Sequence, residues 1–166
     1  YHQEAEPLGT AGALATLGHE LKEDFLFLYG DVMVDFNVAK FISWHQQKKD
    51  AAASLVVHPT DHIHDSDLVE VDEESRVTAL FLKPHAKNPD PQSLGISSVS
   101  ILSPEVFLHI PKGQKSGFEK DVLPYQDNSV DAVLAFNIFE HVYNYPFLLK
   151  EIRRILNGNN QSVLVF

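Results

Sequence analysis

Residues 25–30 read FLFLYG, a short apolar and aromatic run that ends at a glycine and is followed directly by Asp31. Such a run predicts a strand buried on both faces, as in a parallel sheet. Asn37 suits the N-cap of a helix that continues to about residue 49, and residues 52–58 (AASLVVH) predict a second buried strand. Strand, helix and strand in this order form the unit from which parallel sheets are built. The expected fold class is therefore α/β.

The rest of the chain supports this class, because apolar stretches alternate with turn residues throughout. Up to residue 124, the further predicted elements are a helix over 11–22, a hairpin of strands over 68–71 and 77–83, a loop over 84–91, a strand over 96–102 and a short helix opened by Ser103 and Pro104. Beyond it they are a strand over 130–137, a helix over 145–156 and a last strand from residue 162.

Composition excludes several classes of protein. The chain has 166 residues, of which 44% are hydrophobic, enough for a core in one ordinary domain or two small ones. It has no cysteine, so disulfides, thiolate metal sites and thiol nucleophiles are excluded, and the expected compartment is the cytoplasm. No apolar run reaches the ~20 residues that span a bilayer, so we expect no membrane partner. The net charge of −10 argues against binding to nucleic acid and allows a small nucleotide held with a metal.

Asp31 is the first candidate for chemistry. The strand that ends at Gly30 would place this carboxylate at the carboxyl edge of a parallel sheet, where open α/β folds bind ligands. A hard oxygen ligand at that edge suits a Mg²⁺ ion that bridges phosphates. A structural turn after the strand explains the Gly-Asp pair as well. The dipeptide alone leaves both interpretations open.

A series of motifs in the first three quarters of the chain points to a family. The motifs are, in order, EPLGTAGAL (6–14), FLFLYGDV (25–32), DSDLVEVDEESRVTALFLKP (65–84), ILSPEVF (101–107) and GFEKDVLP (117–124). Over residues 1–124 the chain therefore resembles the sugar-1-phosphate nucleotidyltransferases, in particular those that make nucleoside-diphosphate mannose or heptose. The resemblance implies a Rossmann-like three-layer sandwich with a mixed, mostly parallel sheet.

The resemblance also implies a site and a reaction. The residues that it assigns to nucleotide binding are Glu6, Gly9, Thr10, Ala11, Gly12 and Gly30. It assigns Asp31 to a catalytic metal, expected to be Mg²⁺, and Lys83 to the phosphate of a sugar 1-phosphate. The implied reaction is attack of the sugar 1-phosphate on the α-phosphorus of a nucleoside triphosphate, with release of pyrophosphate. Because the nucleophile is already an anion, positioning and charge neutralisation would suffice for catalysis.

Several positions depart from the pattern of that family. The sequence starts at Tyr1, after the place of the glycine-rich loop that cradles the triphosphate, so we expect a chain truncated at its beginning. Ile96 and Ser98 stand where the family usually has Asn and Gly, and Leu82 stands where many members have Glu. A second metal-binding aspartate, expected beyond residue 124, does not occur. The base, the sugar and the oligomeric state stay open.

The end of the chain resembles a different family. LPYQDNSVDAVLAFNIFEHV (123–142), then LKEIRRIL and SVLVF, is similar to the central part of a class I, type 11-like, S-adenosylmethionine-dependent methyltransferase. That resemblance implies that Asn137, Glu140 and His141 border a pocket for S-adenosylmethionine. The expected organisation is a partial nucleotidyltransferase domain over 1–124 joined to a partial methyltransferase-like segment over 125–166, a chimera in which the tail supplies strands to the first sheet.

Three functions remain open on these grounds: nucleotidyl transfer, methyl transfer, and a chimeric remnant without catalysis. Two residue groups also have two interpretations each. His62, His64, Asp65 and Asp67 suit either a Zn²⁺ site or a solvated loop. Lys150, Arg153 and Arg154 form either the solvent face of the last helix or a contact to nucleic acid.

Overall fold

The computed structural model describes residues 3–32, 35–48, 50–85, 90, 92–123, 130–134 and 163–165. Its helices are α1 (Gly9–Ala15), α2 (Val38–His45), the 3-10 helix η1 (Pro104–Leu108) and α3 (Phe118–Asp121). Its strands are β1 (Phe25–Leu28), β2 (Ala53–Pro59), β3 (Leu68–Val71), β4 (Val77–Phe81), β5 (Leu94–Leu102), β6 (Val130–Leu134) and β7 (Val163–Val165).

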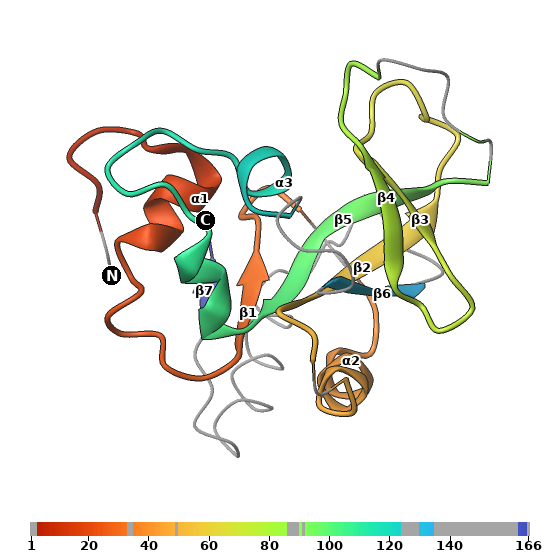
Figure 1. The fold of residues 1–166 in the computed structure, drawn as a ribbon, viewed down its shortest axis with the longest axis horizontal. Helices are drawn as coiled ribbons and strands as arrows, with labels where there is room; N and C mark the ends of the chain where they lie inside the picture. Colours follow the sequence, from red (N-terminus) through yellow and green to blue (C-terminus); the bar gives the residue numbers. More distant parts are fainter. Residues whose placement is uncertain are drawn as a thin grey trace.

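All of the described strands belong to one seven-stranded sheet, with the long strand β5 at its centre (Figure 1). Along one side of β5 lies β2, which is antiparallel to it, and β6 lies parallel to the outer side of β2. Along the other side, β1 pairs with the carboxyl-terminal half of β5 and β3 pairs with its amino-terminal end, both antiparallel. Then β7 lies parallel to β1, and β4 forms a hairpin with β3.

The expectation of a mostly parallel sheet was wrong for the strands that the structure describes. Antiparallel pairing dominates, since only the β1–β7 and β2–β6 pairs are parallel. The first strand–helix–strand unit does run as predicted, with β1 and β2 pointing the same way, but β5 is inserted between them. A buried apolar run indicates that a strand has neighbours on both faces and does not indicate which strand lies beside it.

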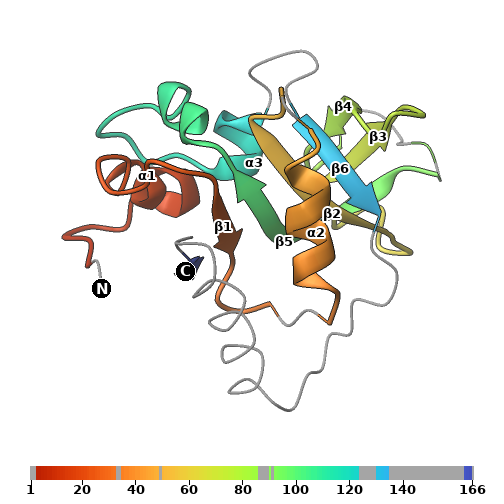
Figure 2. The ribbon, with the colours of Figure 1, turned by 90° about the horizontal axis from the view of Figure 1, so that it is seen from below.

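The three-layer arrangement was confirmed. Alternate residues of β1 point to opposite faces, as the period of a strand requires. Phe25 and Phe27 join the core that α1, η1 and α3 cover, whereas Leu26 and Leu28 join the core beneath α2. Figure 1 shows α2 and α3 on opposite sides of the sheet, and Figure 2 shows α2 lying across β2 and β5. Burial on both faces explains why the FLFL run carries no polar residue.

Local signals placed several element ends correctly. The side chain of Asn37 accepts a hydrogen bond from the Lys40 amide at 2.9 Å, and so caps α2. The hydroxyl of Ser103 accepts one from the Glu105 amide at 3.3 Å at the start of η1. The helix expected over 11–22 was too long: α1 ends at Ala15 and turns follow it. The turns also bury the later leucines of that stripe, so the periodic pattern was satisfied without a continuous helix.

The tail of the chain contributes two strands to this sheet. β6 lies parallel to β2 over Val130–Leu134, and β7 lies parallel to β1 over Val163–Val165. The expectation that tail strands join the first sheet was therefore confirmed, although the helix predicted over 145–156 lies outside the described residues. Among the helices that the structure describes, none has the length and apolar content needed to cross a membrane.

Candidate functional site

A gap in strand pairing lies along one side of β5, where β1 ends and β3 begins. The Tyr29 amide donates to the Ser98 carbonyl at 3.1 Å, and the Ile96 amide donates to the Asp67 carbonyl at 2.9 Å. These two bonds are two residues of β5 apart, about 7 Å of extended chain. Because β1 and β3 both run antiparallel to β5, the residues after β1 and those before β3 meet at this gap.

Asp31 lies in the turn that leaves β1 at the gap. The Val32 amide donates to the Tyr29 carbonyl at 3.4 Å and closes this turn, and Asp31 is exposed within it. Mg²⁺ commonly binds one or two protein carboxylates and takes its remaining ligands from phosphates and water. In the part of the chain that the structure describes, no three His, Asp or Glu side chains gather as a metal site. A single exposed carboxylate such as Asp31 fits a metal that arrives with a nucleotide.

Lys83 reaches the same gap from the end of β4. Its amide donates to Asp67 Oδ1 at 2.9 Å, which ties it to the residue that precedes β3. Its ammonium donates to the carbonyl of Asp65 at 3.0 Å and is exposed. The cation is therefore held by one backbone carbonyl at the surface of the site, where an incoming phosphate can compete for it.

The stretch from Gly9 to Gly12 packs closely on a later segment of the chain. Gly9 has a φ of +77°, and a Cβ atom there would lie 2.5 Å from the Ser116 carbonyl oxygen. A Cβ atom on Gly12 would lie 2.7 Å from the Cβ of Leu8 and 3.1 Å from the Gln114 carbonyl oxygen. The resemblance assigned these glycines to nucleotide binding, where the lack of a side chain allows close approach. The structure gives them a second reason, packing within the protein, which sequence reasoning missed.

Tyr29 is the functional candidate that sequence reasoning did not single out. Its hydroxyl donates to Glu119 Oε1 at 2.6 Å and lies close to the Thr10 hydroxyl, whose oxygen accepts from the Phe118 amide at 2.9 Å. Burial raises the pKa of Tyr29 well above its usual value of 10, and the neighbouring Glu119 carboxylate adds to the rise. The available signal was a hydroxyl at the end of an otherwise apolar strand.

The other predicted site residues lie on the segment before α1, within α1, on a loop, or outside the described residues. Glu6 is exposed on the segment that leads into α1, and Ala11 is buried inside that helix. His62 and His64 lie on the loop between β2 and β3, and no three ligating side chains of the described residues come together there. The residues assigned to the methyl donor, Asn137, Glu140 and His141, and the cluster Lys150, Arg153 and Arg154 lie outside the described residues.

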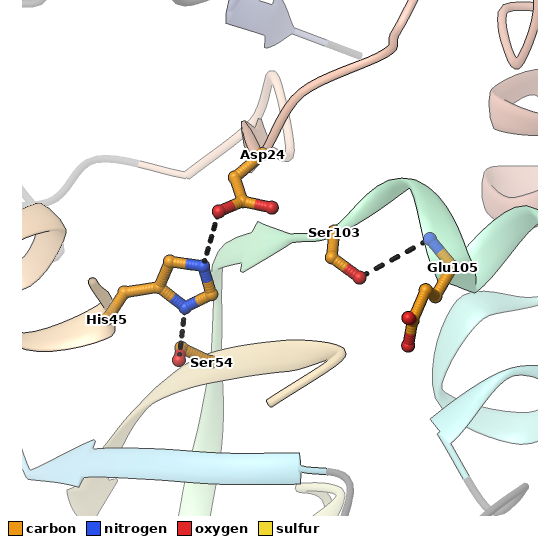
Figure 3. A network of polar contacts seen from close by, with 5 residues as sticks. All are labelled: Asp24, His45, Ser54, Ser103 and Glu105. Atoms are coloured by element: carbon orange, nitrogen blue, oxygen red, sulfur yellow. Dashed lines mark hydrogen bonds and ion pairs between the residues drawn. The ribbon is translucent and has the colours of Figure 1, made fainter. Parts of the chain in front are cut away.

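A second polar network lies at the opposite end of the same strands (Figure 3). His45, at the end of α2, contacts Asp24 Oδ2 through Nε2 at 3.3 Å and Ser54 Oγ through Nδ1 at 2.7 Å. Because a carboxylate only accepts, Nε2 donates to Asp24, and Nδ1 is paired with the Ser54 hydroxyl. Ser54 is fully buried at 0% exposure, so it is no accessible nucleophile. The network connects α2 to β2 and to the residue before β1.

Comparison with known proteins agrees with this arrangement. The sequence profile of the family described as "Nucleotidyl transferase" matches residues 1–140. A mannose-1-phosphate guanylyltransferase of Mycobacterium tuberculosis is 29% identical over 126 residues, which are 75% of this chain and 34% of that protein. The chain thus spans about a third of the length of this curated relative.

Solved structures share the fold. The crystal structure of HddC from Yersinia pseudotuberculosis is similar with a TM-score of 0.61 and 23% identity, over 90% of this chain and 64% of HddC. The same protein has been solved in complex with GMP-PN. A putative glucose-1-phosphate thymidylyltransferase from Bacillus anthracis is similar with a TM-score of 0.69 and 11% identity, over 98% of this chain and 66% of that one.

Proposed function

Because this chain belongs to the nucleotidyl transferase family, we propose that it transfers a nucleotidyl group from a nucleoside triphosphate to a sugar 1-phosphate. In this reaction an oxygen of the sugar 1-phosphate forms a bond to the α-phosphorus, and the bond from that phosphorus to the pyrophosphate oxygen breaks. Pyrophosphate leaves, and no proton has to move. The protein therefore has to position two anions and to neutralise their charge.

One observation carries this proposal. The Thr10 hydroxyl accepts from the Phe118 amide at 2.9 Å and the Tyr29 hydroxyl donates to Glu119 at 2.6 Å, so the Gly9–Gly12 stretch and the residue that begins the Gly30–Asp31 turn meet neighbouring residues of α3. The two motifs assigned to the nucleotide are thereby neighbours at one edge of the sheet. Lys83 lies at the same edge, connected through Asp67 to the first residues of β3.

Each of these groups has a role in the proposal. Asp31 would hold a Mg²⁺ ion, which supplies positive charge at the phosphates when it is bound. Glu6 and the backbone of Gly9–Gly12 and Gly30 would line the nucleotide, and Lys83 would leave the Asp65 carbonyl to bind the phosphate of the sugar. The exposed positions of Asp31 and Lys83 support these roles, since both side chains are open to a ligand.

The names of the relatives suggest the substrates to try first. One relative is a mannose-1-phosphate guanylyltransferase, and HddC was solved with GMP-PN, so we propose GTP as the donor and mannose 1-phosphate as the acceptor. The motifs of residues 1–124 add a heptose 1-phosphate as a second acceptor to try. We also propose a cytoplasmic location, which the absence of cysteine supports.

Calorimetric titration with GTP, in Mg²⁺ and then in excess chelator, tests the binding step. We expect Mg²⁺-dependent binding that weakens about tenfold or more in Asp31→Asn, a change that removes one charge without changing the size of the side chain. Asp35→Asn is the matched control, because Asp35 is an exposed carboxylate that follows the same strand. Release of pyrophosphate on addition of mannose 1-phosphate then tests the transfer.

The same titrations separate the alternatives. Binding of S-adenosylmethionine without binding of any nucleoside triphosphate would favour the methyltransferase interpretation of the tail. Binding of neither ligand would contradict both enzymatic functions and favour a chain without catalysis.

A further inference from the structure

The phenol of Tyr29 lies at the candidate site, and the proposed reaction leaves it without a task. Tyr29 directly follows the strand β1, one residue before Gly30, and its ring packs edge-on against Phe27 at a centroid distance of 5.3 Å. Phe27 in turn packs against Phe118, the first residue of α3, at 5.1 Å. The ring is therefore held by aromatic packing, while its hydroxyl makes polar contacts.

The hydroxyl lies at a pair of hydrogen bonds to α3. Tyr29 donates to the carboxylate of Glu119, and the nearby Thr10 Oγ1 accepts from the amide of Phe118. Both bonds therefore end on neighbouring residues of α3. At 2.6 Å the bond from Tyr29 has the length expected when a hydroxyl donates to a charged carboxylate. This bond joins two residues that are 90 positions apart in the sequence.

The backbone of Tyr29 holds the turn that carries Asp31. Its amide is bonded to Ser98 on β5, and its carbonyl accepts from Val32, which closes the turn around Gly30 and Asp31. A displacement of the phenol would therefore move the turn, because the side chain and the turn share the backbone of Tyr29. Besides Glu119, the negative charge of Asp67 also acts on the Tyr29 hydroxyl. The phenol therefore sits among the Gly9–Gly12 stretch, the metal-binding turn and α3.

We propose that Tyr29 is a positioning residue, whose hydroxyl fixes the Gly30–Asp31 turn against α3 and the Thr10 hydroxyl so that the Asp31 carboxylate is held ready for a nucleotide-bound Mg²⁺ ion. This inference rests on the proposed function. A carboxylate on a fixed turn loses little conformational entropy when it binds a metal. A carboxylate on a loose turn loses more, and the affinity for the metal is lower.

The test compares the affinity for GTP in Mg²⁺ with the affinity in excess chelator. We expect Tyr29→Phe to reduce the ratio of the affinity in Mg²⁺ to the affinity in chelator about fivefold, because it removes one charge-assisted hydrogen bond and keeps the ring. In the Asp31→Asn background the same change should have no further effect on the ratio. Ser54→Ala is the matched control: it also removes a buried hydroxyl, at the other end of the sheet, and should leave the ratio unchanged.

Two further variants and one measurement distinguish the proposed role from a folding defect in Tyr29→Phe. Glu119→Gln keeps an acceptor oxygen for the Tyr29 hydroxyl and should preserve most of the ratio, whereas Glu119→Ala should lower it as Tyr29→Phe does. Amide exchange, followed without any ligand, should become faster at Val32 in Tyr29→Phe, since that amide closes the turn.

The outcomes distinguish this inference from the proposed function. If the native chain binds no nucleoside triphosphate, both fail together. If the native chain binds GTP with a Mg²⁺ dependence that Asp31→Asn abolishes and Tyr29→Phe leaves unchanged, the proposed function stands and the positioning role is overturned. An equal effect of Tyr29→Phe with and without Mg²⁺ also overturns it, because it would show a general structural role.

Discussion

The hydroxyl of Tyr29 affects how the stability of the folded chain depends on pH. Its pKa in the folded state lies above the value of about 10 that an unfolded chain has, because burial and the Glu119 carboxylate both disfavour the phenolate. The folded state therefore keeps its proton where the unfolded state begins to lose it. The stability that the neutral phenol contributes is complete below pH 10 and falls as the pH rises above 10.

We accordingly expect the free energy of unfolding to decrease more steeply above pH 10 in the native chain than in Tyr29→Phe. Urea unfolding at a series of pH values from 8 to 11 measures this difference. Absorbance of tyrosinate gives an independent check, since one of the five tyrosines should ionise only when the chain unfolds. Equal slopes in the two proteins, or full ionisation in the folded chain near pH 10, would contradict the assignment.

Individual site residues could be predicted from the sequence only where they belong to a local motif. Asp31 and Lys83 follow strands that the apolar pattern predicted, Asp31 in the turn after β1 and Lys83 bonded to Asp67 beside β5, and their roles stay a prediction. Tyr29 was missed because its partner Glu119 lies 90 residues away, and no local pattern encodes so distant a contact.

At the level of elements, the stretch that begins α1 depends on its contact with residues 114–118. The amides of Ala11 and Gly12 donate to the Ser116 carbonyl at 3.1 and 3.4 Å, and the Ser116 amide donates to the Leu8 carbonyl at 2.9 Å. Gly9 has both a positive φ and a backbone oxygen where a side chain would begin. This contact brings α1 and α3 together on one face of the sheet.

We expect Gly9→Ala to destabilise the chain by about 2 to 4 kcal/mol, from the strain of the left-handed backbone and from overlap with Ser116. Gly113→Ala is the matched control, because Gly113 also has a positive φ, +66°, but nothing lies within 4 Å of the position of its Cβ atom. That change should cost about 1 kcal/mol, the backbone strain alone. Denaturant unfolding of the two variants gives the difference, and equal losses would contradict a close approach at Gly9.

Most of the described elements were predictable to within a few residues, apart from the end of α1, and their arrangement was not. The hairpin of β3 and β4 and the cap of α2 by Asn37 follow from turn and capping residues that are close in sequence. The order of the sheet depends on β5, which enters between β1 and β2 although it comes later in the chain than both. Such non-local pairing is decided by packing of the whole molecule.

For the whole molecule, the two strands of the tail complete both outer sides of the first strand–helix–strand unit. β6 covers the free edge of β2, and β7 covers the free edge of β1. In the expected organisation these strands belonged to a segment resembling another family. Their placement assigns them at least the structural task of pairing two otherwise unpaired strand edges.

Hydrogen exchange tests this placement in the intact chain. We expect amides in Val130–Leu134 and Val163–Val165 to be protected to a degree comparable with those of β2 and β1, because each is bonded into the same sheet. Substituting proline for Val133, opposite Val56 in the register, should remove protection across β6 while β1 and β5 keep theirs. Rapid exchange throughout residues 130–165 of the native chain would contradict the pairing.

The gap beside β5 has a consequence for how this region can change by mutation. The spacing of Tyr29 and Asp67 is set by Ser98 and Ile96, two residues apart on one continuous strand, and not by side chains that repack. Exchanging the side chains of Ile96 or Ser98 leaves that spacing of about 7 Å intact. An inserted residue would widen it by about 3.3 Å and turn the following side chains to the opposite face. The side chains beside the gap can therefore change by point mutation at constant spacing, whereas a change of spacing requires rebuilding the sheet.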